Sequence, residues 1–123
     1  MAFHNQLGQE GEKIAVQYLK SKNYIIHHTN WRMSHLEIDI IAEHEDELVF
    51  VEVKTRSSDE YGSPEESVNN QKEMDLIRLA NVYLENLQLE VYSRFDIVSI
   101  ILNEKESNIT HFEDAFSAMT FGM

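Results

Sequence analysis

Two short apolar runs, at residues 37–42 and 48–53, are the feature of the sequence that most constrains the fold. Each is too short for a typical helix and is rich in Ile and Val, which favours a β-strand. Only the polar residues 43–47 separate the two runs. We therefore expect a hairpin whose turn is centred on Glu45 and Asp46, with the two strands antiparallel.

The rest of the chain predicts one α/β domain over residues 1–123, in the order α-β-β-β-α-β-β. Apolar residues at helical spacing indicate a helix over about 5–22, with Asn23 as its stop. A strand is expected to open at residues 24–26 and run to Trp31, and residues 57–62 form a polar loop. The remaining expected elements are a helix starting at 63–66 with a buried stripe of Met74, Ile77, Ala80, Leu84 and Leu87, a strand at 95–102, a polar turn at 103–107 and a short strand at 109–112. A crossover helix between the third and fourth strands implies that these two are parallel, so the sheet is mixed and flanked by helices.

Composition excludes several classes of protein. The sequence has no cysteine, so a disulfide framework and a thiolate metal site are both impossible. No apolar run is long enough to span a membrane and the first residues do not resemble a signal peptide, so we expect a cytoplasmic protein with no membrane partner. The net charge of −12 argues against tight unspecific binding to duplex DNA, although counterion release needs only a local basic patch.

The hairpin register predicts a cluster of charges on otherwise apolar strands. Pairing Ile40 with Val51 places Ile38 by Val53, so that one face is apolar, and on the other face it places Asp39 by Glu52 and Glu37 by Lys54. Opposed side chains have Cβ atoms roughly 5 Å apart, and like charges at that distance are destabilising unless something compensates. A hard divalent ion with oxygen ligands, Mg²⁺ or Mn²⁺, would compensate. A slip of one residue would put Asp39 and Glu52 on opposite faces and remove the site.

The alternative to a site is an exposed edge hairpin, in which Glu37 and Lys54 form an ordinary surface ion pair. Apolar residues on both faces of the two runs favour central strands instead.

The first helix carries a further carboxylate. Gly8, Gly11, Glu12, Ala15 and Leu19 share one stripe, and the two glycines predict a close approach of this helix to another backbone. Glu12 therefore either contributes a third carboxylate to the cluster or is a surface charge near the helix start.

Two carboxylates beside a lysine suit phosphodiester hydrolysis. Asp39 and Glu52 would hold the ion, with the Val53 carbonyl as a further oxygen, and the ion would activate a bound water. Lys54 would orient or deprotonate that water or stabilise the transition state. Arg56 and Lys72 are the nearest candidates for holding backbone phosphates, with an exposed charge at a strand end as the alternative for Arg56.

The sequence resembles the small bacterial YraN-like proteins over Gly8 to Ile100. The resemblance rests on Gly11-Glu12, on residues 37–42 and 48–56, on residues 61–65, on Val68 with Lys72, and on Arg94-Phe95-Asp96. That family is similar to the PD-(D/E)xK nucleases, which include Holliday-junction resolvases and restriction endonucleases. The resemblance thus implies a restriction-endonuclease-like core with Asp39, Glu52 and Lys54 as the catalytic set. It also matches Glu12 to a helical glutamate, and Lys72 to a helical lysine after the third strand.

The sequence thus predicts a nuclease dependent on Mg²⁺ or Mn²⁺ that acts on DNA, including branched or otherwise structured DNA. The alternative is a non-catalytic module that keeps the fold and binds nucleic acid or serves as an adaptor. A homodimer is compatible with cutting two strands, since two-fold symmetry serves that purpose.

Overall fold

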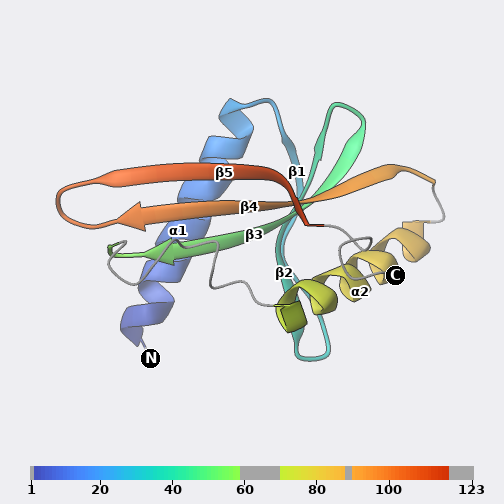
Figure 1. The fold of residues 1–123 in the computed structure, drawn as a ribbon, viewed down its shortest axis with the longest axis horizontal. Helices are drawn as coiled ribbons and strands as arrows, with labels where there is room; N and C mark the ends of the chain where they lie inside the picture. The colour runs from blue at the N-terminus through green and yellow to red at the C-terminus, as the bar shows by residue number, and fades with distance from the viewer. Residues whose placement is uncertain (1, 59–69, 88–89, 117–123) are drawn as a thin grey trace.

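The computed structural model confirms the expected α/β class and the order of its elements (Figure 1). It describes residues 2–58, 70–87 and 90–116, and for residues 2–5 and 70 it describes only the backbone. The expected helix start at residues 63–66 lies outside the described residues. The described elements are α1 (Ala2–Ser21), β1 (Ile25–Met33), β2 (Leu36–His44), β3 (Glu47–Arg56), α2 (Asn70–Leu87), β4 (Tyr92–Leu102) and β5 (Ser107–Phe116).

The strands form one sheet in the order β1-β2-β3-β4-β5. β3 and β4 are parallel and every other neighbouring pair is antiparallel, which confirms the mixed sheet. β5 is longer than the expected strand at 109–112, because its outer residues are exposed on an edge strand and carry no apolar pattern. β2 and β3 are interior strands, so the alternative of an exposed edge hairpin is wrong.

Local backbone chemistry explains the ends of two elements. Asn23 adopts a left-handed φ of 71°, and the N–H of Tyr24 donates to the carbonyl of Leu19 at 3.0 Å, which is a Schellman end for α1. Glu45 and Asp46 have φ values of 49° and 67°, as a type I′ turn requires. The expected helix stop and hairpin turn are therefore confirmed.

The two helices cover opposite faces of the sheet (Figure 1). On one face, Ala15 and Leu19 of α1 pack on the interior strands, and on the other Ile77 and Ala80 of α2 do so. Burying a side chain as large as Leu19 or Ile77 stabilises the fold by about 1.5–3 kcal/mol. Leu87 does not belong to the buried stripe as expected, because it is the last residue of α2 and is 38% exposed. In the described part of the chain, neither helix is both long and apolar enough to cross a membrane.

The interior strands separate part-way along their length, and this fork creates the candidate site. The β2–β3 ladder runs from His44–Glu47 to Ile40–Val51 in the expected register. Beyond that point β2 stays paired with β1, and β3 with β4, so the strands run apart (Figure 1). The Asp39 side chain enters the fork, where its Oδ2 accepts the Val53 N–H at 2.8 Å.

The fork corrects two expected pairs. Ile38 does not face Val53, because it packs in the cluster under α2 whereas Val53 packs under α1. Glu37 does not oppose Lys54, and its Oε2 instead accepts from Arg32 Nε at 2.6 Å. Both expectations assumed a ladder that continues past Ile40.

Candidate functional site

Asp39 and Glu52 are brought together although their backbones are no longer paired. Burial of Asp39 raises its pKa well above the usual range. The charge of Glu52 raises this pKa further, as does the hydrogen bond between the two carboxyls, and the Val53 N–H opposes the shift. Two carboxyl groups thus meet in a place that disfavours two negative charges.

Glu52 has a cationic partner from another element. Its side chain is only 3% exposed, and its Oε1 forms an ion pair with Lys72 Nζ of α2. Burial alone would lower the pKa of Lys72, but the negative charges of Glu52 and Asp39 outweigh it and the pKa is raised. The structure therefore joins Lys72 to the cluster, which spacing along the chain could not establish.

Lys54 and Arg56 line the same cavity as the carboxylates. This cavity, of about 440 Å³, is bounded by Asp39, Glu52, Lys54, Arg56 and Lys72, among others. Burial lowers the pKa of Lys54, and the positive charges of Lys72 and Arg56 lower it further. Three of the ten Lys and Arg residues in the sequence thus surround one cavity. A second cavity of about 230 Å³ adjoins Asp39, Glu52 and Lys72 from the side of α2.

Glu12 of α1 lies at the edge of the same cluster. Its Oε1 accepts from Asn30 Nδ2 at 2.6 Å, and the same nitrogen donates to Glu37 Oε1 at 3.1 Å. Burial raises the pKa of Glu12, the Asn30 hydrogen bond opposes this, and the charges of Glu37 and Glu52 raise it further. Glu12 is therefore half-buried among carboxylates and is not a free surface charge.

The expected close approach of α1 is found at one glycine and not at the other. A Cβ at Gly11 would lie 1.8 Å from Thr55 Oγ1 and 2.8 Å from Thr55 Cβ, so only glycine lets α1 lie this close to β3. The contact is with a side chain rather than with the expected backbone. The expectation is wrong for Gly8, where a Cβ would meet nothing within 4 Å.

The carboxylates fit a divalent ion as a pair rather than as a complete cage. Within residues 2–58, 70–87 and 90–116, no group of three or more His, Cys, Asp or Glu side chains is arranged to hold a metal ion. Mg²⁺ commonly uses only one or two protein carboxylates, and water and substrate phosphates complete its coordination. Asp39 and Glu52 meet that requirement. Ligation by the Val53 carbonyl stays a prediction.

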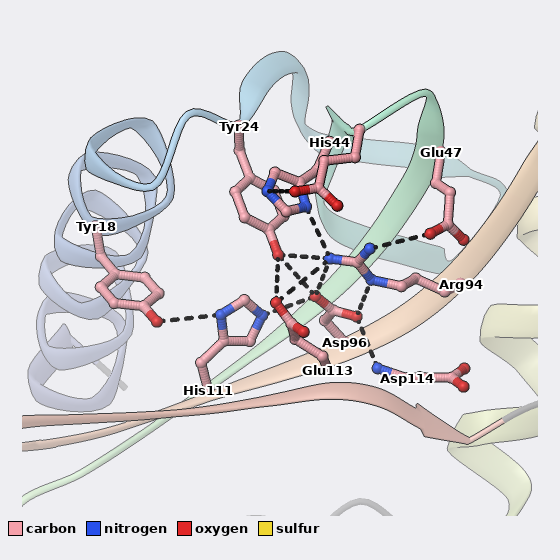
Figure 2. A network of polar contacts seen from close by, with 10 residues as sticks. Tyr18, Tyr24, His44, Glu47, Arg94, Asp96, His111, Glu113 and Asp114 are labelled. Carbon is pink, nitrogen blue, oxygen red and sulfur yellow. Dashed lines mark hydrogen bonds and ion pairs between the residues drawn. The ribbon is translucent and has the colours of Figure 1, made fainter.

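A second polar network lies around a buried aspartate of β4 (Figure 2). Asp96 is fully buried, and its carboxylate accepts from Arg94 Nε at 3.1 Å and from the Asp114 N–H at 3.0 Å. His111 Nε2 lies 2.7 Å from the same carboxylate. Burial would raise the pKa of Asp96, but His111, Arg94 and the Asp114 N–H together hold it below its usual range. Arg94 also contacts Glu47 of β3 at 3.3 Å, so the network ties three strands together.

Sequence reasoning assigned no role to Asn30 or to this network. Asp96 carries a usable signal, since it is a lone acid inside the apolar run 95–102, as Asp39 is inside 38–42. Asn30 carries none, because its amide acts only through a left-handed backbone with φ of 52°. Such a backbone cannot be deduced from residue type alone.

The fold and the site together define an α/β protein whose central strands fork around two carboxylates and a lysine. The chain belongs to the uncharacterised protein family UPF0102, whose model matches residues 11–100, and the resemblance to the YraN-like proteins is thereby confirmed. A UPF0102 protein of Bacteroides thetaiotaomicron is 46% identical over 94% of this chain and 96% of its own length. A UPF0102 protein of Flavobacterium psychrophilum is 47% identical over 94% of this chain and 98% of its own length.

Proposed function

We propose that this protein is a nuclease that uses Mg²⁺ or Mn²⁺ to hydrolyse phosphodiester bonds in DNA. The observation that carries the proposal is the meeting of Asp39 and Glu52 in the strand fork, with Lys54 lining the same cavity. Restriction-endonuclease-like proteins, which the sequence resembles, carry such a set on a mixed sheet. The proposal includes branched or structured DNA, as the resemblance to Holliday-junction resolvases suggests.

Asp39 and Glu52 are the residues that would hold the ion. Their oxygen donors suit a hard divalent cation. Burial, and then the charge of Glu52, raises the pKa of Asp39, and a bound cation would favour its charged form. When bound, the ion would offset charge on a phosphate oxygen and lower the pKa of a water molecule.

Lys54 would act on the reacting phosphate, since it lines the same cavity as the two carboxylates. Because burial lowers the pKa of Lys54, its ammonium gives up a proton more readily than that of an exposed lysine. It can therefore either stabilise the developing charge as the ammonium or accept a proton as the amine. Glu12, held by Asn30, adds negative charge at the cavity edge and is proposed to strengthen cation binding there.

The net charge of −12 does not prevent contact with a phosphate group, because several cationic side chains lie close together at the site. Lys54, Arg56 and Lys72 converge on one cavity, and short-range contacts to one or two phosphates need only such a local group. Binding through so few cations is weak on uniform duplex DNA. We therefore expect a preference for DNA whose shape presents its backbone to the fork.

A non-catalytic binding module is the second candidate. The strongly acidic composition favours it, since an inactive adaptor need not hold a DNA duplex tightly. The two candidates differ in cleavage and agree in fold.

A cleavage panel tests the proposal. Linear, single-stranded, flap and four-way-junction DNA, together with RNA, are incubated with the full chain in Mg²⁺, in Mn²⁺ or in EDTA. We expect metal-dependent cleavage of at least one DNA substrate, reduced at least 100-fold by Asp39→Ala or Lys54→Ala, in line with the loss of a key catalytic group.

Arg78→Met is the matched control, because Arg78 lies on the same helix as Lys72 but is 65% exposed and paired with Asp75. It should cleave like the wild type. If Asp39→Ala and Lys54→Ala both cleave as well as the wild type does, the activity comes from a contaminating nuclease. Binding without cleavage of any substrate would support the adaptor instead.

A further inference from the structure

The Glu52–Lys72 ion pair crosses from β3 to α2 at the centre of the candidate site. Glu52 is 3% exposed, whereas the Lys72 side chain is 41% exposed. A buried carboxylate requires a counter-charge, and the ammonium supplies it through direct contact. The partner of this carboxylate therefore comes from a long side chain that reaches in from solvent.

We propose that the Lys72 ammonium competes with the divalent cation for Glu52, and that a substrate phosphate relieves this competition by drawing Lys72 away. Metal and DNA would then bind cooperatively. This inference rests on the proposed function, because it assumes that Asp39 and Glu52 hold the cation.

Electrostatics makes the two cations rivals. Both would sit on the same buried carboxylate, where a single positive and a double positive charge a few ångströms apart repel strongly in a low-dielectric setting. Lys54 and Arg56, which line the same cavity, add to the positive field that an incoming ion meets. Lys72 therefore holds metal affinity down as long as it remains on Glu52.

The position of Lys72 would allow its ammonium to leave Glu52 and contact a phosphate group instead. Lys72 lines both the 440 Å³ cavity and the adjoining 230 Å³ cavity, so its long side chain has space on either side into which the ammonium can move. A phosphate in the larger cavity would also meet Lys54 and Arg56. If the phosphate attracts Lys72, it frees Glu52 for the ion, and by linkage the ion strengthens phosphate binding by the same factor.

Metal titration of the full chain tests the inference without requiring activity. Mn²⁺ binding is measured by calorimetry and by the Mn²⁺-induced change in melting temperature. The variants are Lys72→Met, which removes the rival charge at similar size, Lys72→Arg, which retains it, Arg78→Met as the control on the same helix, and Asp39→Asn. Circular dichroism checks that each variant is folded.

We expect Lys72→Met to bind Mn²⁺ about tenfold more tightly than the wild type, within the range by which groups around a metal site tune affinity. Lys72→Arg and Arg78→Met should bind like the wild type. A nuclease-resistant phosphorothioate DNA should tighten Mn²⁺ binding to the wild type and narrow its difference from Lys72→Met.

Two outcomes separate this inference from the proposed function. If the wild type binds Mn²⁺ and Asp39→Asn does not, but Lys72→Met binds equally or more weakly, competition is refuted and the nuclease proposal stands. If neither the wild type nor Lys72→Met binds Mn²⁺, the metal site itself is refuted, and both proposals fail.

Discussion

Gly8 and Gly11 lie one turn apart in α1, and the same substitution at each should have opposite effects on stability. In a helix interior, alanine is favoured over glycine by about 1 kcal/mol. At Gly8 a methyl group meets nothing within 4 Å, so Gly8→Ala should stabilise the protein by about 0.5–1 kcal/mol. This predicts a melting temperature about 2–5 °C higher.

At Gly11 the same methyl group collides with Thr55. Rotation of Thr55 could move Oγ1, but Cβ, 2.8 Å away, is fixed to the strand. An ordinary carbon contact is about 3.5–4.0 Å, so α1 must retreat by roughly 1 Å. Overpacking of this kind costs about 1–3 kcal/mol, and the helix preference offsets only part of it. Gly11→Ala should therefore lower the melting temperature by about 5 °C.

Calorimetric melting of both variants in EDTA measures these effects. A Mn²⁺ titration adds a second readout, since retreat of α1 at Gly11 carries the neighbouring Glu12 away from the cavity and should weaken metal binding. Gly8→Ala is the internal control for that titration. Melting temperatures that shift in the same direction and by similar amounts would refute the inferred close contact of α1 with β3.

Three further predictions follow from the buried acids and their donors. In EDTA at pH 7, Asp39→Asn should stabilise the protein by about 1 kcal/mol in urea unfolding. The amide oxygen can still accept the Val53 N–H, and the substitution removes both the cost of burying a carboxylate and its repulsion by Glu52. Destabilisation would contradict the raised pKa of Asp39. That advantage should shrink in acid, since the wild type gains stability as the pH falls through the raised folded pKa of Asp39. Asp96→Asn should lower the free energy of unfolding by about 3 kcal/mol at pH 7. This difference from the wild type should narrow below the unfolded pKa of about 3.8, because the lowered folded pKa of Asp96 gives stability that is lost as the pH falls through it. A difference that does not change with pH would count against this account. Asn30→Gly keeps the left-handed backbone but removes the amide that holds Glu12, so Mn²⁺ affinity should fall about tenfold in calorimetry, and an unchanged affinity would deny Asn30 a positioning role.

Much of the fold follows from local patterns in the sequence. The β-branched runs at 37–42 and 48–53 predicted strands because their neighbours are polar and their length is too short for a helix. Asn23 and the residues Glu45 and Asp46 predicted a helix end and a turn, and their left-handed backbones confirm both. The parallel pairing of β3 with β4 followed from the helix between them.

The geometry of the site could not be deduced in the same way. The register was right from Ile40 to His44, but the fork beyond it depends on β2 pairing with β1 and β3 pairing with β4. The β1–β2 pairing is a second local hairpin, whereas the β3–β4 pairing joins residues about 45 positions apart, such as Glu52 and Ile97. No residue in the β2–β3 hairpin encodes either pairing. The Glu52–Lys72 contact is of the same kind, because it depends on how α2 docks on the sheet.

Asp39 and Asp96 show why burial of an acid does not by itself define a site. Both interrupt apolar strands of one sheet, and burial acts on both in the same direction. The carboxylate of Asp96 contacts Arg94 and His111 and accepts a backbone N–H, so its pKa falls and its charge is balanced within the protein. Asp39 is buried near the negative charges of Glu52 and Glu12 and accepts only one backbone N–H among the described contacts, so its pKa rises. Among the described residues, Lys72 forms an ion pair with Glu52, whereas the direct hydrogen-bond donor to Asp39 is a neutral backbone N–H. The acidic neighbours of Asp39, and not its burial alone, are the reason why we propose a cation site at the fork between β2 and β3.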